Sequence, residues 1–405
     1  MNPEVMQARR AIESLRSGVP NRDVVAQLGT TQHEIRERFE DSLDAIVQGQ
    51  GVEPILISAT FGAGKTHLLT YLQSLAEREG FVTSYSVISP EMPIGNAHFV
   101  SRALAESARA PGRAGRALRA LAPELPEGPG ALGVVSSWIE NAGVDDRYRA
   151  LIRLYEAYRA DEEFRLQILG ELEGRAILKN VIKGRLRLIN EAAGYDLSGP
   201  RPALLAHDRI RLLAQMFKAS GAKGWVILFD EMERVAKFSL NQRLAAYSQL
   251  GWWRRIARTA GSVILPVFTT ASGFVADTVT GGTFDEQRVK SATSNDQRDV
   301  DAVDGIDLLK SPLRLDSPTP EEEAEIKYRV KSIYELAYGV SVDDLPSDAL
   351  DVRISIRSEI RRWITLWDLH RYYPDYRPDV AVDDVHFDPD AIDDAQILEE
   401  DDPTE

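Results

Sequence analysis

The segment Ala59–Thr66, which reads ATFGAGKT, carries the residue types that bind phosphate. It fits the phosphate-loop pattern GxxxxGK[ST], except that Ala59 stands where the first glycine is usual. Gly62 and Gly64 permit backbone angles that let successive N–H groups converge on phosphate oxygens. Lys65 is then expected to contact the β- and γ-phosphates of a nucleotide, and the hydroxyl of Thr66 to coordinate Mg²⁺.

The surroundings of this segment favour a phosphate loop over a chance Gly-Lys-Thr in an ordinary loop. The apolar run Pro54–Ala59 predicts a buried strand, and residues 66–78 place their leucines on one face of a helix. The N-terminus of that helix directs its positive dipole end at the phosphates. The predicted nucleotide contacts are Thr60, Phe61, Gly62, Ala63, Gly64, Lys65, Thr66 and His67.

A second apolar run, Trp225–Phe229, leads directly into Asp230 and Glu231. The carboxyl ends of buried parallel strands lie at the sheet edge where α/β proteins bind ligands. Asp230 is expected to hold Mg²⁺ through water, and Glu231 to orient and deprotonate an attacking water. Acids that merely end a strand in solvent are the alternative, which the upstream phosphate loop disfavours.

A carboxylate directly after the Mg²⁺ aspartate points to hydrolytic ATPases with an extra strand between the two motifs. The run Ser262–Thr270 is that strand, and its tip is polar. Thr270 is assigned as the sensor of the γ-phosphate. Thr269 in that role, or a purely structural role, stays open because the ends of strands are uncertain by a few residues.

The pattern along the whole chain predicts an α/β protein, namely a P-loop NTPase of the AAA+ (ASCE) type with a parallel sheet. Helical patterns cover Gln7–Ser17, Asn21–Leu28, Thr31–Ile46, most of 100–220, and 319–373, whereas Phe81–Ser89 is β-rich and 272–306 suggests loops. The expected units are N-terminal helices (1–48), an ATPase core (49–315) with a helical insertion at about 100–220, a helical lid (316–377) and an acidic, disordered tail (378–405).

The C-terminal helices resemble the lid of AAA+ ATPases, where an arginine near the start of a later helix reaches the γ-phosphate. The sequence from Thr319 to Glu323 predicts a capped helix start, and Ile356–Leu369 predicts a later amphipathic helix. Arg357 is the sensor candidate, with surface salt bridges as the alternative. An arginine finger acting in trans is left undecided among Arg254, Arg255 and Arg288.

Composition narrows the function classes. The net charge is −15, but Asp379–Glu405 holds twelve acidic and no basic residues, so the remainder carries only −3. That tail is expected to be solvated, with mimicry of nucleic acid as the alternative. The chain has no cysteine, no histidine pair at helical spacing, no membrane-length apolar run and no signal-peptide core. We therefore expect a cytoplasmic protein without a bound transition metal or a membrane partner.

Two segments are candidates for contact with DNA. Residues 21–40 fit a helix-turn-helix, but their mixed charge favours helices that pack beside the phosphate loop near the adenine. The insertion has a better basic footprint, which consists of Arg109, Arg113, Arg116, Arg119, Lys179, Lys183, Arg185 and Arg187.

The chain resembles the BrxD-like ATP-binding proteins of BREX phage-defence systems. The resemblance rests on Ala8–Gly29, Phe61–Leu75, Phe81–Ser89, Leu228–Glu231 and Leu265–Phe274, and it continues to the Arg357 region. Two departures are Ala59 in place of glycine and Ile356-Arg357 in place of a Pro-Arg pair. The resemblance implies an AAA+ ATPase in anti-phage defence that handles DNA beside a helicase-like partner.

The leading interpretation is an ATP-hydrolysing motor or loader that acts as a homo-oligomer or in a hetero-complex. A nucleotide-operated switch with little turnover is the alternative, because a switch needs only Lys65, Thr66 and Asp230. A small-molecule kinase fits less well, since Glu231 beside the Mg²⁺ aspartate suits water as the nucleophile. ATP is preferred over GTP because the base-reading pattern Asn/Thr-Lys-x-Asp is absent.

Overall fold

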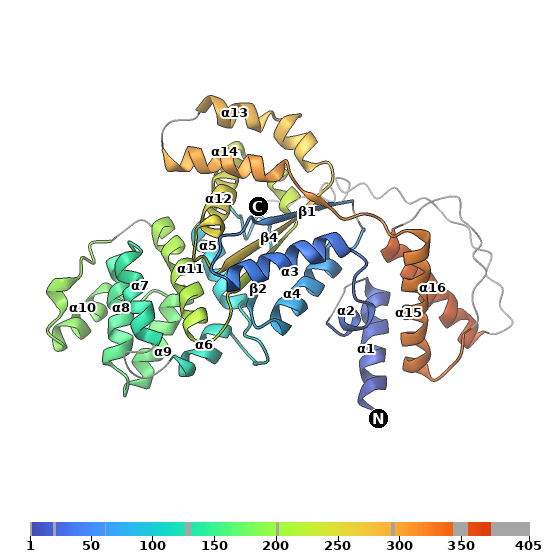
Figure 1. Ribbon diagram of the computed structural model, residues 1–405, viewed down its shortest axis with the longest axis horizontal. Coiled ribbons are helices and arrows are strands. Elements are labelled where there is room, and N and C mark those ends of the chain that lie inside the picture. The colour runs from blue at the N-terminus through green and yellow to red at the C-terminus, as the bar shows by residue number, and fades with distance from the viewer. Residues whose placement is uncertain are drawn as a thin grey trace, which may run out of the picture.

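The structure is a computed structural model that describes residues 2–18, 22–60, 62–125, 131–199, 202–292, 296–342 and 355–373. The expected acidic tail (378–405) lies outside the described residues. Figure 1 shows a central sheet, a helical insertion at one end and a helical group near the N-terminus at the other. Among the described residues, no helix is long and apolar enough to cross a membrane.

The sheet is parallel throughout, and its five strands lie in the order β2-β3-β4-β1-β5. The strands are β1 (Ile55–Ala59), β2 (Val82–Val87), β3 (Trp225–Asp230), β4 (Ile264–Ala271) and β5 (Leu313–Arg314). Every residue of β3 is buried, as expected where helices cover both faces of a parallel sheet. β4 lies between β1 and β3, which confirms the predicted extra strand between the two motifs.

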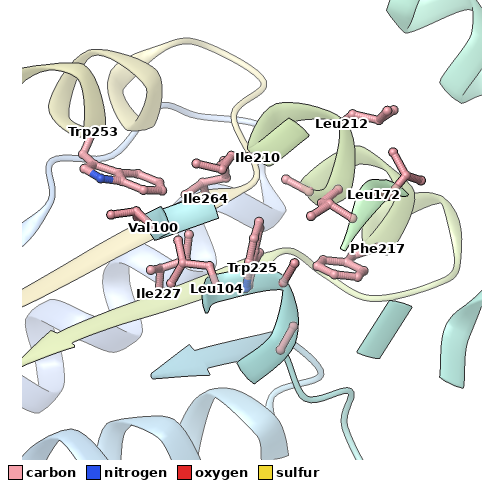
Figure 2. Packing of buried hydrophobic residues seen from close by; sticks show 14 of the residues in the cluster. Val100, Leu104, Leu172, Ile210, Leu212, Phe217, Trp225, Ile227, Trp253 and Ile264 are labelled. Atoms are coloured by element: carbon pink, nitrogen blue, oxygen red, sulfur yellow. The ribbon is translucent and has the colours of Figure 1, made fainter. Parts of the chain in front are cut away.

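The two faces of the sheet are covered by different helices. Alternate residues of β3 point to opposite faces, so Val226 and Leu228 pack with α3 (His33–Val47) and α4 (Lys65–Arg78). Ile227 joins the larger cluster on the other face, whose helices include α5 (Ala97–Ser107), α11 (Pro202–Ala219) and α12 (Leu240–Arg258). Figure 2 shows Trp225 and Ile227 of β3 in that cluster, together with side chains of those helices.

The insertion is helical, as predicted. Its elements are α6 (Ala117–Leu121), η1 (Ala122–Glu124), α7 (Ala131–Asn141), α8 (Asp146–Ala157), α9 (Glu162–Leu172), α10 (Lys179–Leu188) and η2 (Ala192–Gly194). Buried residues of these helices belong to the same hydrophobic cluster as α5 and α11. The insertion is therefore anchored on one side of the sheet, with α10 near its outer end (Figure 1).

A third hydrophobic cluster joins the two ends of the described chain. It is formed by α1 (Pro3–Ser17), α2 (Arg22–Leu28), α15 (Pro320–Tyr338) and α16 (Ile356–Tyr372). Helix α15 begins with the predicted cap, in which Thr319 and Glu322 bond reciprocally. The first two helices thus pack on the C-terminal helices, whereas α3 packs on the sheet.

The expectation of loops over 272–306 was wrong. This region forms η4 (Val275–Thr280), α13 (Asp285–Ala292) and α14 (Gln297–Leu309). Helix α14 approaches the backbone of α12 through glycines: a β-carbon at Gly305 would lie 2.0 Å from the carbonyl oxygen of Tyr247, and one at Gly251 would lie 1.7 Å from that of Asp301. Because backbone contact replaces much of the side-chain packing between α12 and α14, the apolar periodicity by which a helix is predicted is weak in this region.

Candidate functional site

The predicted phosphate loop connects β1 to α4, which begins at Lys65. Gly62 and Gly64 have φ angles of 77° and 99°, the left-handed region in which glycine lacks the penalty of a β-carbon. A β-carbon at Gly62 would also lie 2.8 Å from the β-carbon of Ser355, the N-cap residue of α16. The backbone angles of both glycines therefore fit the predicted phosphate loop, and α16 begins directly against Gly62. Phe61 lies outside the described residues.

Asp230 is the centre of a hydrogen-bond cluster at the carboxyl edge of the sheet. Its Oδ2 accepts hydrogen bonds from Thr66 Oγ1 at 3.2 Å and from the phenol of Tyr85 at 2.7 Å. Its Oδ1 accepts from Thr269 Oγ1, and from the backbone N–H of Glu231 at 3.0 Å. The structure thus brings together Thr66 and Asp230, the two residues predicted to serve a Mg²⁺ ion.

Sequence reasoning missed Tyr85, which lies on β2. Burial, followed by the charge of Asp230, raises the pKa of Tyr85 well above its usual value. The phenol therefore stays protonated and acts as a hydrogen-bond donor. The neighbouring strand positions the tyrosine, because β2 and β3 pair in parallel with Tyr85 opposite Leu228. A sequence pattern contains no signal for that register.

The two threonines at the end of β4 lie on opposite faces of the sheet. Thr269 follows Leu265 and Val267 on the face covered by α4, where it reaches Asp230. Thr270 follows Phe268 on the other face; it is buried, and its hydroxyl has no hydrogen-bond partner in the described structure. The assignment of Thr270 as the phosphate sensor stays a prediction, and Thr269 is the threonine that contacts the predicted Mg²⁺ ligand.

Two glutamates follow β3, and they differ in what they contact. Glu231 has a φ of 65°, which is uncommon for a residue with a side chain, and its carboxylate is paired with Arg234. Glu233, on the 3₁₀ turn η3 (Met232–Lys237), accepts a hydrogen bond from Lys65 Nζ at 3.0 Å. Sequence reasoning missed Glu233, since the usual pattern places the catalytic carboxylate directly after the aspartate.

A pocket opens beside the phosphate loop, between the core and the helical group of α1, α2, α15 and α16. Its lining includes Gly29, Gly62, His67, Ile326 and Arg357. The Nε2 atom of His67 lies 2.8 Å from the carbonyl oxygen of Gly29. Burial lowers the pKa of this histidine. The neutral ring therefore links α4 to the turn after α2 through this hydrogen bond. This arrangement agrees with the expectation that residues 21–40 pack beside the phosphate loop.

Arg357 lies in this pocket and has no hydrogen bond or ion pair to any residue that the structure describes. Its Cδ would lie 3.3 Å from a β-carbon at Gly18. The three arginines considered for a finger differ in their contacts. Arg254 is paired with Glu53, and Arg255 makes two bonds of 2.9 Å to Asp301. The exposed Arg288 has no side-chain pair within the described ranges.

Some basic residues of the insertion have an acidic partner, and others have none among the described residues. Arg116, Arg119 and Arg175 all pair with the buried Glu173. Arg185 pairs with Asp161 and lies over the ring of Phe164, at 4.4 Å from its centroid. By contrast, the side chains of Lys179, Lys183 and Arg187 have no hydrogen-bond or ion-pair partner among the described residues, and their spacing places them along one face of α10.

The parallel sheet, the phosphate loop and the carboxylate cluster are consistent with a P-loop NTPase. The family model of the BREX system ATP-binding protein BrxC/D matches residues 5–122 and 203–375. The chain therefore belongs to the BrxC/D family of ATP-binding proteins, which confirms the resemblance seen in the sequence. The unmatched stretch between these segments contains α7–α10. Among curated proteins, none matches the chain.

Proposed function

We propose that this protein is an AAA+ ATPase that binds ATP with Mg²⁺ and hydrolyses it to ADP and phosphate. The observation that carries the proposal is the 3.2 Å hydrogen bond between Thr66 Oγ1 and Asp230 Oδ2 beside the phosphate loop. A hydroxyl and a carboxylate at this place form the donor set that holds Mg²⁺ in P-loop proteins. The strand order, with β4 between β1 and β3, supports the same class.

The residues divide the work as follows. Backbone N–H groups of residues 60–66 cradle the phosphates, with Lys65 on the β- and γ-phosphates. Thr66 and Asp230 would hold Mg²⁺, which when bound would neutralise charge on the phosphates. Glu231 orients the attacking water and accepts its proton. Arg357 reaches the nucleotide from α16, whose first turn lies against Gly62.

We further propose that the ATPase works in anti-phage defence, in a homo-oligomer or with a helicase-like partner. Family membership supports the defence role, because the family consists of ATP-binding proteins of BREX systems. The exposed Arg288 on α13 is the finger candidate with no internal pair in the described structure, so it is available to a neighbouring subunit.

Phosphate release from ATP tests the ATPase proposal. The purified protein is compared with Lys65→Ala and Glu231→Gln, each with and without DNA. We expect both substitutions to abolish turnover, and Glu231→Gln to retain ATP binding, because Glu231 acts on water rather than on the phosphates. Turnover that survives Lys65→Ala would contradict the assigned site.

A nucleotide-operated switch is the second candidate, and one contact favours it. The carboxylate of Glu231 is paired with Arg234, and in this pairing it is not free to accept a proton from an attacking water. A switch would bind ATP tightly, lose binding only in Lys65→Ala, and release no phosphate with or without DNA. That result would direct attention to a partner that completes the site.

Contact with DNA is proposed through α10, where Lys179, Lys183 and Arg187 form the free basic face. Arg185, which the sequence analysis placed in the same basic group, pairs with Asp161 and lies over the ring of Phe164. Reversal of Lys179, Lys183 and Arg187 to glutamate should therefore abolish DNA binding and its salt dependence. The control reverses the exposed Arg78, Lys218 and Lys223, which changes the net charge equally. Unchanged DNA affinity at low salt in the α10 variant would exclude this surface.

A further inference from the structure

Glu233 is held in the phosphate site by two donors from different elements. Its Oε1 accepts from Lys65 Nζ, and its Oε2 accepts from the backbone N–H of Ala271, both at 3.0 Å. Lys65 begins the helix after the phosphate loop, whereas Ala271 ends β4 and lies in register with Ala59 of β1. The carboxylate thus spans the space between the loop lysine and the tip of the central strand.

A carboxylate that accepts one hydrogen bond on each oxygen from such donors matches one edge of a phosphate group. Lys65 is the residue expected to contact the β- and γ-phosphates, and the tip of β4 is where a γ-phosphate sensor is expected. We propose that Glu233 occupies the position of the terminal phosphate in the nucleotide-free protein and must leave Lys65 when ATP binds. The proposal rests on the nucleotide site described above.

Electrostatics gives the direction of this exchange. A γ-phosphate on Lys65 would lie next to the Glu233 carboxylate, and two anions in a partly enclosed site repel each other. The triphosphate brings Mg²⁺ and gains the N–H groups of the phosphate loop, so it displaces a single carboxylate. ADP has no γ-phosphate, so Glu233 can keep its bond from the Ala271 N–H and share Lys65 with the β-phosphate when ADP is bound.

The displacement needs only a side-chain rotation. Met232 and Val235 on η3 are fully buried and fix the backbone of that turn. Glu233 lies between these anchors, with its side chain 27% exposed, so it has room to turn toward solvent. Glu231 is the N-cap residue of this turn, and its carboxylate is paired with Arg234. Release of Glu233 therefore removes hydrogen bonds that hold the turn next to the proposed catalytic glutamate.

Consequently, Glu233 makes the site respond to the third phosphate. It lowers the affinity for ATP by the cost of breaking its own contacts, and it leaves the affinity for ADP largely unchanged. Loss of the Glu233 charge should raise the ATP affinity. The gain should be in proportion to the population of the protein in which Glu233 had occupied Lys65.

Equilibrium binding of fluorescent ATP and ADP analogues, with Mg²⁺, tests the proposal in Glu233→Gln. We expect the Kd for the ATP analogue to fall about tenfold and that for the ADP analogue to change less than about twofold. In phosphate release, KM falls while kcat is retained. Glu233→Asp, whose shorter side chain cannot span both donors, should give a smaller effect of the same sign. Glu79→Gln removes the same charge from a surface pair with Lys223 and is the control.

The outcomes separate this proposal from the proposed hydrolysis. If the wild-type protein binds ATP without turnover, the hydrolysis proposal fails, and the binding comparison still decides the role of Glu233. An unchanged or weaker ATP affinity in Glu233→Gln would overturn the exchange. So would an equal gain for ADP. Loss of turnover at unchanged affinity would instead make Glu233 the catalytic carboxylate.

Discussion

The phenol of Tyr85 donates a 2.7 Å hydrogen bond to the carboxylate of Asp230, from a strand that lies more than a hundred residues earlier in the chain. This contact falls on Oδ2, the same oxygen that accepts from Thr66. An outer partner of this kind orients a metal-binding carboxylate, and the loss of such partners commonly weakens metal affinity or activity by about 10- to 100-fold.

Tyr85→Phe tests this relationship. We expect the Mg²⁺ concentration for half-maximal ATP binding to rise about tenfold, because Asp230 loses the donor that fixes its orientation. Tyr71→Phe, on the partly buried Tyr71 of α4, removes a phenol from the same core and is the matched control. Equal effects of the two variants would show that Tyr85 acts only through general stability.

The threonines at the end of β4 are expected to behave differently when each is changed to valine. Thr269→Val removes a donor to Asp230 and should reduce ATP turnover about tenfold. Thr270→Val removes a buried hydroxyl without a partner in the described structure, so it should leave the free energy of unfolding unchanged or raise it by about 1 kcal/mol. Thermal unfolding measures the stability of the two variants, and phosphate release measures their ATP turnover. Loss of turnover in Thr270→Val alone would support its predicted role as the sensor.

Arg357→Gln should weaken ATP binding about tenfold, because a charge-assisted bond from α16 to the phosphates would be lost. Arg361→Gln is the control, since Arg361 is exposed on the same helix one turn later and does not line the pocket. Titration with an ATP analogue gives both affinities. Equal affinities in the two variants would remove Arg357 from the site.

His207 predicts a pH dependence of stability. Its ring stacks on Trp252 at 4.1 Å between centroids, its Nε2 bonds Gln249, and burial lowers its pKa below 6.5. Because the unfolded chain binds this proton more readily, the stabilisation is complete above about pH 6.5 and is lost as the pH falls from there to the folded pKa. The slope contributed by this residue is at most about 1.4 kcal/mol per pH unit.

Denaturant unfolding between pH 7.5 and about pH 5 measures that slope. His207→Gln should make the dependence shallower than in the wild-type protein. His370→Gln, which changes an exposed side chain, is the control. A slope that His207→Gln leaves unaltered would mean that His207 is not responsible.

The contact between α12 and α14 predicts a large loss of stability in Gly305→Ala. The added methyl group would meet the carbonyl oxygen of Tyr247 at 2.0 Å, so the helices must separate, at a cost of about 3 kcal/mol. Gly184→Ala on α10 is the control, because nothing lies within 4 Å of that position. It should instead stabilise the protein by about 0.5–1 kcal/mol, through helix propensity. Denaturant unfolding compares the two.

The sequence by itself determined the features that depend on neighbouring residues. The phosphate loop could be predicted because its glycines, Lys65 and Thr66 are close together in the chain, and β3 is recognisable because burial on both faces demands an uninterrupted apolar run. The cap at Thr319 is local in the same sense. These elements, the parallel sheet and the family could all be predicted.

Only the tertiary structure decided which side chains meet. Tyr85 reaches Asp230 through the pairing of β2 with β3, and Thr269 reaches it through the pleat of β4, so strand register selects both contacts. The left-handed turn at Glu231 and the following η3 place Glu233 on Lys65. Each of these contacts joins residues far apart in the chain. For the two contacts made from strands, a change of one position in register would turn the side chain to the opposite face of the sheet.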